Sequence, residues 1–166
     1  AVREVGAWRV REVIVTHPNF DHYSGLPDAM DALGVERVSF SRAFLDRASA
    51  GPDGAAAALI AALRERGVEV RTLSAGDVFR LGDAAVRVLS PPEPSPFAAD
   101  NDNSLVAQLR VPTAGGERRV LLCGDIQREA IATLLTPDAD LRAEVLELPH
   151  HGSVQPTALA LVDAVD

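Results

Sequence analysis

The chain has 166 residues, of which 47% are hydrophobic, and its formal net charge at pH 7 is -8. This length and composition predict an ordinary α/β protein of one domain, covering residues 1–166, with enough chain to bury a core. No apolar run approaches the roughly 18 residues that a membrane-spanning helix needs, and the negative net charge argues against a broad basic surface that grips nucleic-acid phosphates.

The predicted elements begin with residues 9–16, which alternate and then become continuously apolar, as in a strand covered on both faces. Residues 27–33 are predicted to be a helix that ends at Gly34. Residues 41–54 are expected to be a loop, with Asp53 capping the alanine-rich helix that follows.

Periodicity of apolar residues and the positions of Gly and Pro predict the other elements. Strands are predicted at residues 35–40, 68–73, 78–81, 84–89, 104–111, 118–123 and 145–148. The alanine-rich helix is predicted to end at residue 66, before Gly67. Two further helices are predicted at residues 127–135 and 157–165. The proline-rich residues 91–96 are expected to be a loop.

All four histidines of the chain lie in two clusters, each at the end of an apolar strand and each beside a Ser-Gly or Gly-Ser pair: His17 with His22, and His150 with His151. Ligands at strand ends are typical of metal sites. The alternative is two unrelated pairs of loop histidines bonded to backbone groups.

Asp125 also follows an apolar strand, at residues 120–124. Together with the histidines it is the natural carboxylate to bridge two ions, and this mixture of ligands suits zinc, manganese or iron rather than calcium. Taken alone, an aspartate at position 125 is more often the N-cap of the helix predicted at residues 127–135.

These motifs carry a resemblance to a known family. The segment Thr16-His-Pro-Asn-Phe-Asp-His22 resembles the His-x-His-x-Asp-His signature of the metallo-β-lactamase fold. Later segments follow in the order of one branch, the hydrolase domain of ComEC-type DNA-uptake proteins: Leu89-Ser-Pro-Pro92, Asn101-Asp-Asn-Ser-Leu-Val106, Leu121-Leu-Cys-Gly-Asp-Ile126 and Leu148-Pro-His-His-Gly-Ser153. The resemblance covers about residues 9 to 155 and implies an α/β (α+β) fold, an αββα sandwich with a two-metal site at its strand ends.

The resemblance also implies roles for individual residues. His17 and, more weakly, Asn19 are implied as ligands of the first metal, and Asp21 and His22 as ligands of the second. Asp125 is implied to bridge two divalent ions, zinc or manganese. One of His150 and His151 is implied to complete the second site, while its neighbour either contacts the substrate or supports a ligand from behind, and the sequence leaves open which is which.

Catalytic roles are expected for Asp21, which is placed to orient the attacking water, and for the pair His150 and His151. Substrate contacts are expected from Asn103, Ser104 and Ser153.

Three departures from the family pattern stand out. Position 19 is Asn, where the superfamily has His and this branch usually has Asp, so the first metal site is expected to be weak. The usual third motif lacks a histidine, and Asp100, Asn101 or Asn103 are the candidates for its place, with a polar turn as the alternative. The opening strands of the fold and its closing strand-helix unit are missing, so the chain is expected to be part of a longer protein.

The implied function is metal-dependent hydrolysis of a phosphodiester, with DNA as partner and substrate, by water that the ions activate. By itself the chain is expected to be soluble. The resemblance implies a membrane channel as a possible partner and a position outside or at the membrane. The sequence leaves the native metal and the oligomeric state open. Two alternatives remain: an ester, lactone or thioester hydrolase of the same fold, and a degenerate scaffold domain without activity.

Six further side chains carry simpler interpretations. Cys123, on an apolar strand, is expected to be a buried thiol, and Trp8 and Tyr23 are expected to pack in the core. Arg42, like Arg47 and Arg128, is expected to lie on the solvated surface.

Overall fold

A computed structural model describes residues 4, 6 and 9–165. These residues form two compact units, divided between residues 72 and 73. Each unit contains one sheet with flanking helices, which confirms the predicted α/β fold class. That the chain is a single domain stays a prediction. Trp8 lies outside the described residues.

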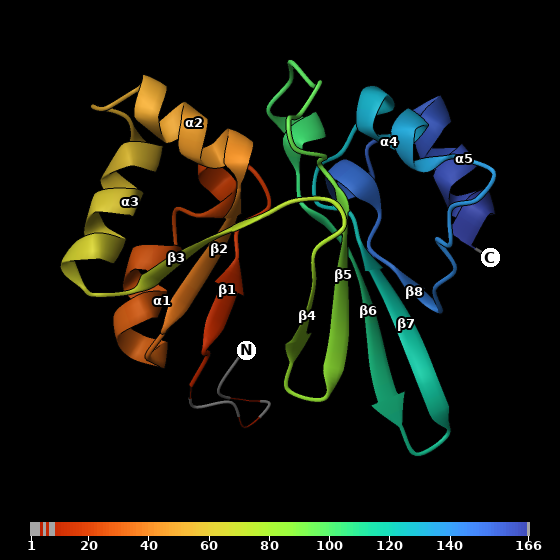
Figure 1. Cartoon of the computed structure of the whole chain (residues 1–166), viewed down its shortest axis with the longest axis horizontal. Helices are drawn as coiled ribbons and strands as arrows, with labels where there is room; N and C mark the ends of the chain where they lie inside the picture. The colour runs from red at the N-terminus through yellow and green to blue at the C-terminus, as the bar shows by residue number, and fades with distance from the viewer. Residues whose placement is uncertain (1–3, 5, 7–8, 166) are drawn as a thin grey trace. The chain divides into compact units, whose positions relative to one another are not determined.

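The first unit contains a three-stranded sheet in the order β1-β2-β3, with β1 and β2 parallel and Val13 in register with Val38. Its strands are β1 (Glu12–Ile14), β2 (Arg37–Ser41) and β3 (Glu69–Leu73), and its helices are α1 (Leu26–Leu33), α2 (Arg42–Ala50) and α3 (Ala55–Glu65). Figure 1 shows this unit at the red-to-yellow end of the chain.

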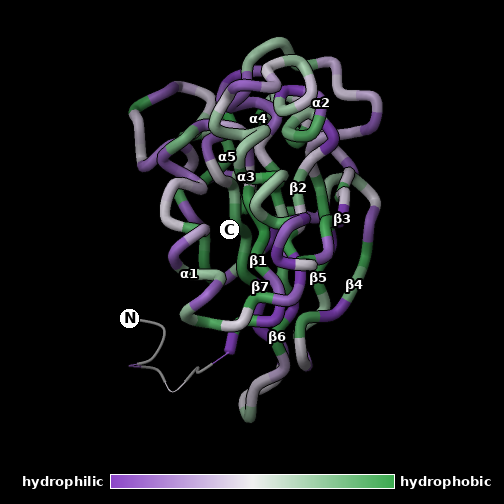
Figure 2. Tube along the Cα trace, turned by 90° about the vertical axis from the view of Figure 1, so that its left-hand side faces the viewer, coloured by the Kyte–Doolittle hydropathy of each residue, from purple (hydrophilic) through white to green (hydrophobic). Residues whose placement is uncertain are grey.

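All three helices of the first unit contribute to one core. Met30 of α1, Phe44 of α2 and Leu63 of α3 pack in the same buried cluster as Val38 and Phe40 of strand β2. Because Val38 and Phe40 are two positions apart on a strand, they point to the same face, so the helices cover that face of the sheet. Figure 2 shows the matching pattern along the chain, with a mostly hydrophobic strand β1 and a helix α1 of mixed hydropathy.

The opposite face of this sheet carries a polar network. The Glu12 side chain is only 7% exposed, and its carboxylate accepts hydrogen bonds from the Ser39 hydroxyl, at 2.6 Å, and from the Arg71 guanidinium. Arg71 Nε also donates to Ser39 Oγ at 3.0 Å. One residue from each strand therefore joins the three strands together.

The second unit contains a five-stranded sheet in the order β4-β5-β6-β7-β8, antiparallel except for the parallel pair β7 and β8. Its strands are β4 (Val78–Leu81), β5 (Ala84–Ser90), β6 (Val106–Thr113), β7 (Gly116–Leu122) and β8 (Val145–Leu146), and its helices are α4 (Arg128–Leu134) and α5 (Pro156–Val165). Ile131 of α4 and Leu161 of α5 pack with Val106 and Leu121 of the sheet in a second core.

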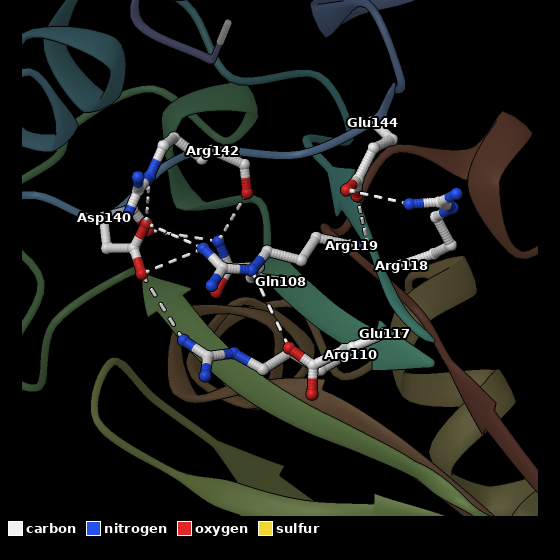
Figure 3. A network of polar contacts seen from close by, with 8 residues as sticks. All are labelled: Gln108, Arg110, Glu117, Arg118, Arg119, Asp140, Arg142 and Glu144. Atoms are coloured by element: carbon white, nitrogen blue, oxygen red, sulfur yellow. Dashed lines mark hydrogen bonds and ion pairs between the residues drawn. The ribbon is translucent and has the colours of Figure 1, made fainter. Parts of the chain in front are cut away.

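A charged network fixes the loop before β8 to strands β6 and β7 (Figure 3). Arg119 Nη1 donates to both carboxylate oxygens of Asp140, at 3.0 and 3.1 Å. The buried amide of Gln108 donates to the backbone carbonyls of Asp140 and Arg142, both at 3.1 Å. These bonds hold the chain that leads into the histidine-bearing segment after β8.

Most predicted elements are confirmed, with shifted ends. Gly82 lies in the turn of the β4-β5 hairpin at a φ of 58°, and Gly67, at a φ of 65°, follows the last turn of α3. Tyr23 is buried with its ring edge-on to Phe44, and Cys123 is fully buried.

Two predictions for residues 41–54 are wrong. Residues 41–54 are not a loop throughout, since helix α2 occupies most of them and Ser41 caps it by accepting a 3.3 Å hydrogen bond from the backbone N–H of Phe44. Asp53 is not the cap of α3, because Gly54 is the N-cap residue.

Candidate metal centre

Strand β1 leads into the first histidine cluster. The backbone N–H of Val15 donates to the Ser39 carbonyl at 3.0 Å, which extends the pairing with β2 by one residue beyond the strand. A single 3₁₀ turn, Phe20–His22, then reverses the chain. It brings the ring of His22 back against the ring of His17, with centroids 4.1 Å apart.

Thr16 lies between the two rings of this cluster. Its Oγ1 is 3.0 Å from Nδ1 of His17 and 3.4 Å from Nδ1 of His22. Metal-binding histidines are held in this way, with one ring nitrogen bonded to the protein so that the other is oriented as a ligand. Nε2 of His22 lies 3.5 Å from Oδ2 of Asp21, so an imidazole and a carboxylate are already adjacent here.

Asn19 begins the 3₁₀ turn. Its backbone carbonyl accepts a 3.0 Å hydrogen bond from the N–H of His22, and its own backbone is extended at φ -79° and ψ 135°. Its part in shaping the turn is therefore clear, while its role as a weak metal ligand stays a prediction.

In the second unit, Asp125 lies in the turn that follows strand β7. Gly124 adopts a left-handed φ of 54°, which turns the chain at the strand end. The backbone N–H of Asp125 donates to Ser104 Oγ at 3.1 Å. The Asp125 side chain is only 7% exposed, so its carboxylate is held at a defined place rather than in solvent.

Asp125 is not the cap of helix α4. The backbone N–H groups at the start of that helix, from Gln127 and Ala130, donate to Oδ1 of Asp102 at 2.8 and 3.1 Å. The buried carboxylate of Asp102 therefore accepts the hydrogen bonds of this helix N-terminus. The alternative interpretation of Asp125, as the N-cap of this helix, is wrong.

Glu147 ties the Asp125 turn to the second histidine pair. Its Oε2 accepts hydrogen bonds from the backbone N–H of Cys123 at 2.9 Å and of Gly124 at 3.0 Å. In return, the N–H of His150 donates to the Gly124 carbonyl at 3.0 Å. The two segments are thus joined by three hydrogen bonds.

The second histidine pair has an unusual backbone. His150 and His151 have φ values of 50° and 55°, and Gly152 continues the left-handed run at 77°. Left-handed conformations are unfavourable for residues with a Cβ, cost about 1–3 kcal/mol each, and concentrate at functional sites. The consequence is that the two rings separate, with centroids 6.2 Å apart.

Each ring of this pair has a different partner. Nε2 of His151 lies 3.4 Å from Oδ2 of Asp125. Nδ1 of His150 lies instead 2.9 Å from Nε2 of the Gln127 side chain. The structure therefore separates the environments of two neighbouring histidines that the sequence could not separate.

Of the predicted substrate-binding residues, Ser104 contacts the Asp125 turn. Ser104 accepts from the Asp125 backbone, as described above. The amide of Asn103 donates to the carbonyls of Phe97 and Ala99, at 3.0 and 2.9 Å, and accepts from the Ser95 hydroxyl at 2.6 Å. Asn103 thus holds the proline-rich loop, and the substrate contacts of all three residues stay predictions.

Ser153 is exposed and donates its backbone N–H to the His150 carbonyl at 2.9 Å. The other candidates for the third motif lie in the 3₁₀ turn before Ser104, where the Asp100 carbonyl accepts from the N–H of Asn103 and Asn101 begins the turn. Their ligand roles are untested.

Sequence reasoning missed the residues that hold the candidate ligands in place. These are Thr16, Asp102, Gln127 and Glu147. A signal existed only for Thr16, which adjoins His17; the other three act on residues at least 23 positions away in the chain.

Both units carry side chains that could hold a metal ion: His17, Asp21 and His22 in the first, and Asp125 and His151 in the second. Imidazole nitrogens and carboxylate oxygens are ligands that zinc and manganese accept. The contacts within each unit fit that use, since Thr16 orients two imidazoles by Nδ1 and an imidazole lies beside the Asp125 carboxylate. The donors of each unit, taken by themselves, are therefore chemically suited to divalent metal.

The chain belongs to the metallo-beta-lactamase superfamily, whose family model matches residues 1–166. It is a hydrolase of that superfamily and is distantly homologous to ComE operon protein 3 of Bacillus subtilis (strain 168), with 28% identity over 148 residues. The match covers 89% of this chain but 18% of the relative, so the chain spans about a fifth of that protein's length.

Solved structures show the same fold. The metallo-beta-lactamase GOB-18 from Elizabethkingia meningoseptica aligns with a TM-score of 0.61 at 12% identity, over 99% of this chain and 72% of that chain. BJP-1, a subclass B3 metallo-beta-lactamase of Bradyrhizobium japonicum, aligns with a TM-score of 0.57 at 15% identity, over 98% of this chain and 74% of that chain. At these identities the likeness concerns the fold alone. Among the described residues, no helix is both long and apolar enough to cross a membrane.

Proposed function

We propose that this chain is a metal-dependent phosphodiesterase that acts on DNA. The observation that carries the proposal is the pairing of the His151 imidazole with the Asp125 carboxylate at a strand end, in a chain related to ComE operon protein 3. The DNA-uptake context, including a membrane channel as partner, belongs to the same proposal. It is not carried over from the relative, because this chain matches 18% of that protein.

The proposed metal ligands are His17, Asp21, His22, Asp125 and His151, with Asn19 as a weak addition and two ions as the expected number. Divalent ions held there supply Lewis acidity, which makes water a better nucleophile and neutralises charge on phosphate oxygens. They also explain how a chain with a net charge of -8 takes a polyanion, because bound cations reverse the local potential.

The remaining roles fall to the chain's own side chains. Asp21 is 70% exposed beside His22, where its carboxylate can accept a hydrogen bond from the attacking water and orient it. His150 is proposed to donate to an oxygen of the substrate. Ser104 fixes the backbone of Asp125, so that this carboxylate keeps its position while the substrate changes.

The test is hydrolysis of bis(p-nitrophenyl) phosphate and of single-stranded DNA by the chain supplied with manganese or zinc. We expect cleavage that a chelator abolishes and that falls to background in Asp125→Ala. The matched control is Asp138→Ala, a change at an exposed carboxylate in the same unit, which should keep full activity. Cleavage that resists the chelator, or that survives in Asp125→Ala, contradicts the proposal.

A second candidate is hydrolysis of an ester, lactone or thioester. The net charge of -8 favours a neutral substrate over a polynucleotide. A panel of aryl esters, acyl lactones and thioesters, run beside the phosphodiesters, distinguishes the two. Faster turnover of any ester than of the phosphodiesters would move the assignment to this candidate.

A further inference from the structure

Gln127 contacts the ring of His150 from the residue before helix α4. The amide Nε2 of Gln127 lies 2.9 Å from Nδ1 of His150. The backbone of Gln127 is itself fixed, since its N–H donates to the buried carboxylate of Asp102 at 2.8 Å. The contact is therefore anchored on both sides, by Asp102 on one and by the strained backbone of His150 on the other.

The direction of this hydrogen bond determines where the proton of His150 lies. An amide nitrogen only donates, so Nδ1 of His150 must be the acceptor. In a neutral imidazole the proton is then on Nε2, since one ring nitrogen is the donor and the other the acceptor. A ring in this state has its lone pair occupied by Gln127 and presents an N–H group at its other nitrogen.

We propose that Gln127 is a positioning residue that selects the Nε2–H tautomer of His150, and so makes this histidine a hydrogen-bond donor to the substrate rather than a metal ligand. The inference rests on the proposed function in one respect, that the histidine pair serves a hydrolytic site. It assigns different tasks to adjacent residues: His151, beside Asp125, binds metal, and His150 binds substrate oxygen.

The backbone geometry supports this division. A metal ligand needs an unprotonated nitrogen directed at the ion, and His151 has Nε2 within 3.4 Å of the Asp125 carboxylate. The consecutive left-handed residues turn the His150 ring away, to a centroid distance of 6.2 Å from that of His151. The hydrogen bond from Gln127 then stabilises one state of the separated ring.

The test is nitrogen-15 NMR of the full chain labelled at histidine, recorded at pH 8, above the ordinary histidine pKa of about 6.5. Long-range proton-nitrogen spectra distinguish the Nδ1–H and Nε2–H tautomers of each ring. In the metal-free chain we expect His150 in the Nε2–H form, and on addition of zinc we expect the His151 nitrogens to shift while His150 keeps its pattern.

Two variants change the proton position in different ways. In Gln127→Glu the carboxylate can only accept, so His150 should move to the Nδ1–H form. In Gln127→Met, which has a similar shape but neither donates nor accepts strongly, both tautomers should appear. Neither change should alter the tautomer of His151, and backbone amide spectra report whether each variant is folded. Since Gln127→Glu keeps the size of the side chain, it provides the test if Gln127→Met does not fold.

The inference is overturned by an Nδ1–H pattern for His150 in the unchanged chain, by an identical His150 pattern in folded Gln127→Glu, or by a zinc-induced shift of a His150 nitrogen into the range of a ligand. In kinetics, Gln127→Met should lower kcat about 10-fold with little change in KM. The tautomer is measured without turnover. A chain with the expected tautomer and no hydrolysis would therefore contradict the proposed function alone, and hydrolysis with the wrong tautomer would contradict this inference alone.

Discussion

The carboxylate of Asp102 accepts a 2.8 Å hydrogen bond from the backbone N–H of Gln127, at the point where helix α4 begins. A second bond, from the N–H of Ala130 at 3.1 Å, goes to the same oxygen. Since Asp102 is 25 residues earlier in the chain, this is a tertiary cap, and it fixes the residue that contacts His150.

Asp102→Ala should lower the free energy of unfolding by about 2 kcal/mol, because two backbone donors, one of them buried, lose a charged acceptor. Asp102→Asn should cost less, since its amide oxygen can still accept. The measurement is urea denaturation, with Asp138→Ala as an exposed control that should stay within about 0.5 kcal/mol of the unchanged chain. Equal effects of Asp102→Ala and Asp138→Ala would show that the cap does not stabilise the fold.

Glu147 should matter for both stability and metal affinity. Glu147→Ala leaves the N–H groups of Cys123 and Gly124 without their acceptor and loosens the turn that carries Asp125, so we expect a loss of about 1–3 kcal/mol in stability and of about 10-fold or more in zinc affinity. Calorimetric titration with zinc measures the second effect. Glu129→Ala, an exposed change on α4, is the control and should leave affinity unchanged.

The amide at position 19 provides a test of the weak first metal site. Asn19→Asp supplies a charged ligand, so it should raise the affinity for the more weakly held manganese or zinc ion without changing the tighter one. Asn19→Ala should have a small effect, because a neutral amide contributes little. Competition with a metal-sensitive dye resolves the two affinities. If Asn19→Ala removed as much metal as His22→Ala, the description of Asn19 as a weak ligand would be wrong.

The Asp140 network should make stability depend on pH in the acid range. Partial burial acts to raise the pKa of Asp140, but the hydrogen bond from Arg142 and the charge of Arg119 outweigh it, so the pKa is lower than usual. A carboxyl with a lowered pKa in the folded state contributes stability above its unfolded pKa of about 3.9, and that contribution is lost as the pH falls through the folded value.

The comparison is therefore between the unchanged chain and Asp140→Asn, followed by urea denaturation from pH 7 to pH 2. At neutral pH the variant should be less stable by on the order of 1 kcal/mol, since the ion pairs are partly exposed. The difference should shrink below about pH 4. A difference that stays constant across this range would mean that the charge of Asp140 is not what stabilises the loop.

Local patterns in the sequence were enough to predict most of the fold. The strand before His17 and the strands at residues 78–81 and 84–89 follow from alternation and from the turn residues between them, all of which involve neighbours in the chain. Helix α2 was not predicted, because the Gly-Pro-Asp-Gly segment at residues 51–54 is typical of a loop and the loop was extended back to residue 41. The signal was present in Ser41, a good N-cap, and in Phe44 and Ala48, four positions apart on one buried helix face.

The contacts around the candidate ligands were predictable only in part, for the same reason. His17, Asp125 and the pair after β8 are recognisable as candidates because each follows the end of an apolar strand, and His22 because it lies close to His17 in the chain. Their supports are not recognisable, because Glu147 and Gln127 meet their partners only after the chain has folded. The left-handed backbone at His150 is likewise not predictable from the sequence, since the enrichment of histidine in that conformation is too small to identify one position.

The central claim, that this hydrolase depends on metal, is tested most directly by its metal content. The full chain is dialysed against zinc or manganese at near-neutral pH, freed of excess metal, and analysed for its elements, beside His22→Ala and Asp125→Ala. We predict about two ions per chain for the unchanged protein and clearly fewer for each variant. A folded, unchanged chain that retains no ion, or variants that retain as much as the unchanged chain, would contradict the account.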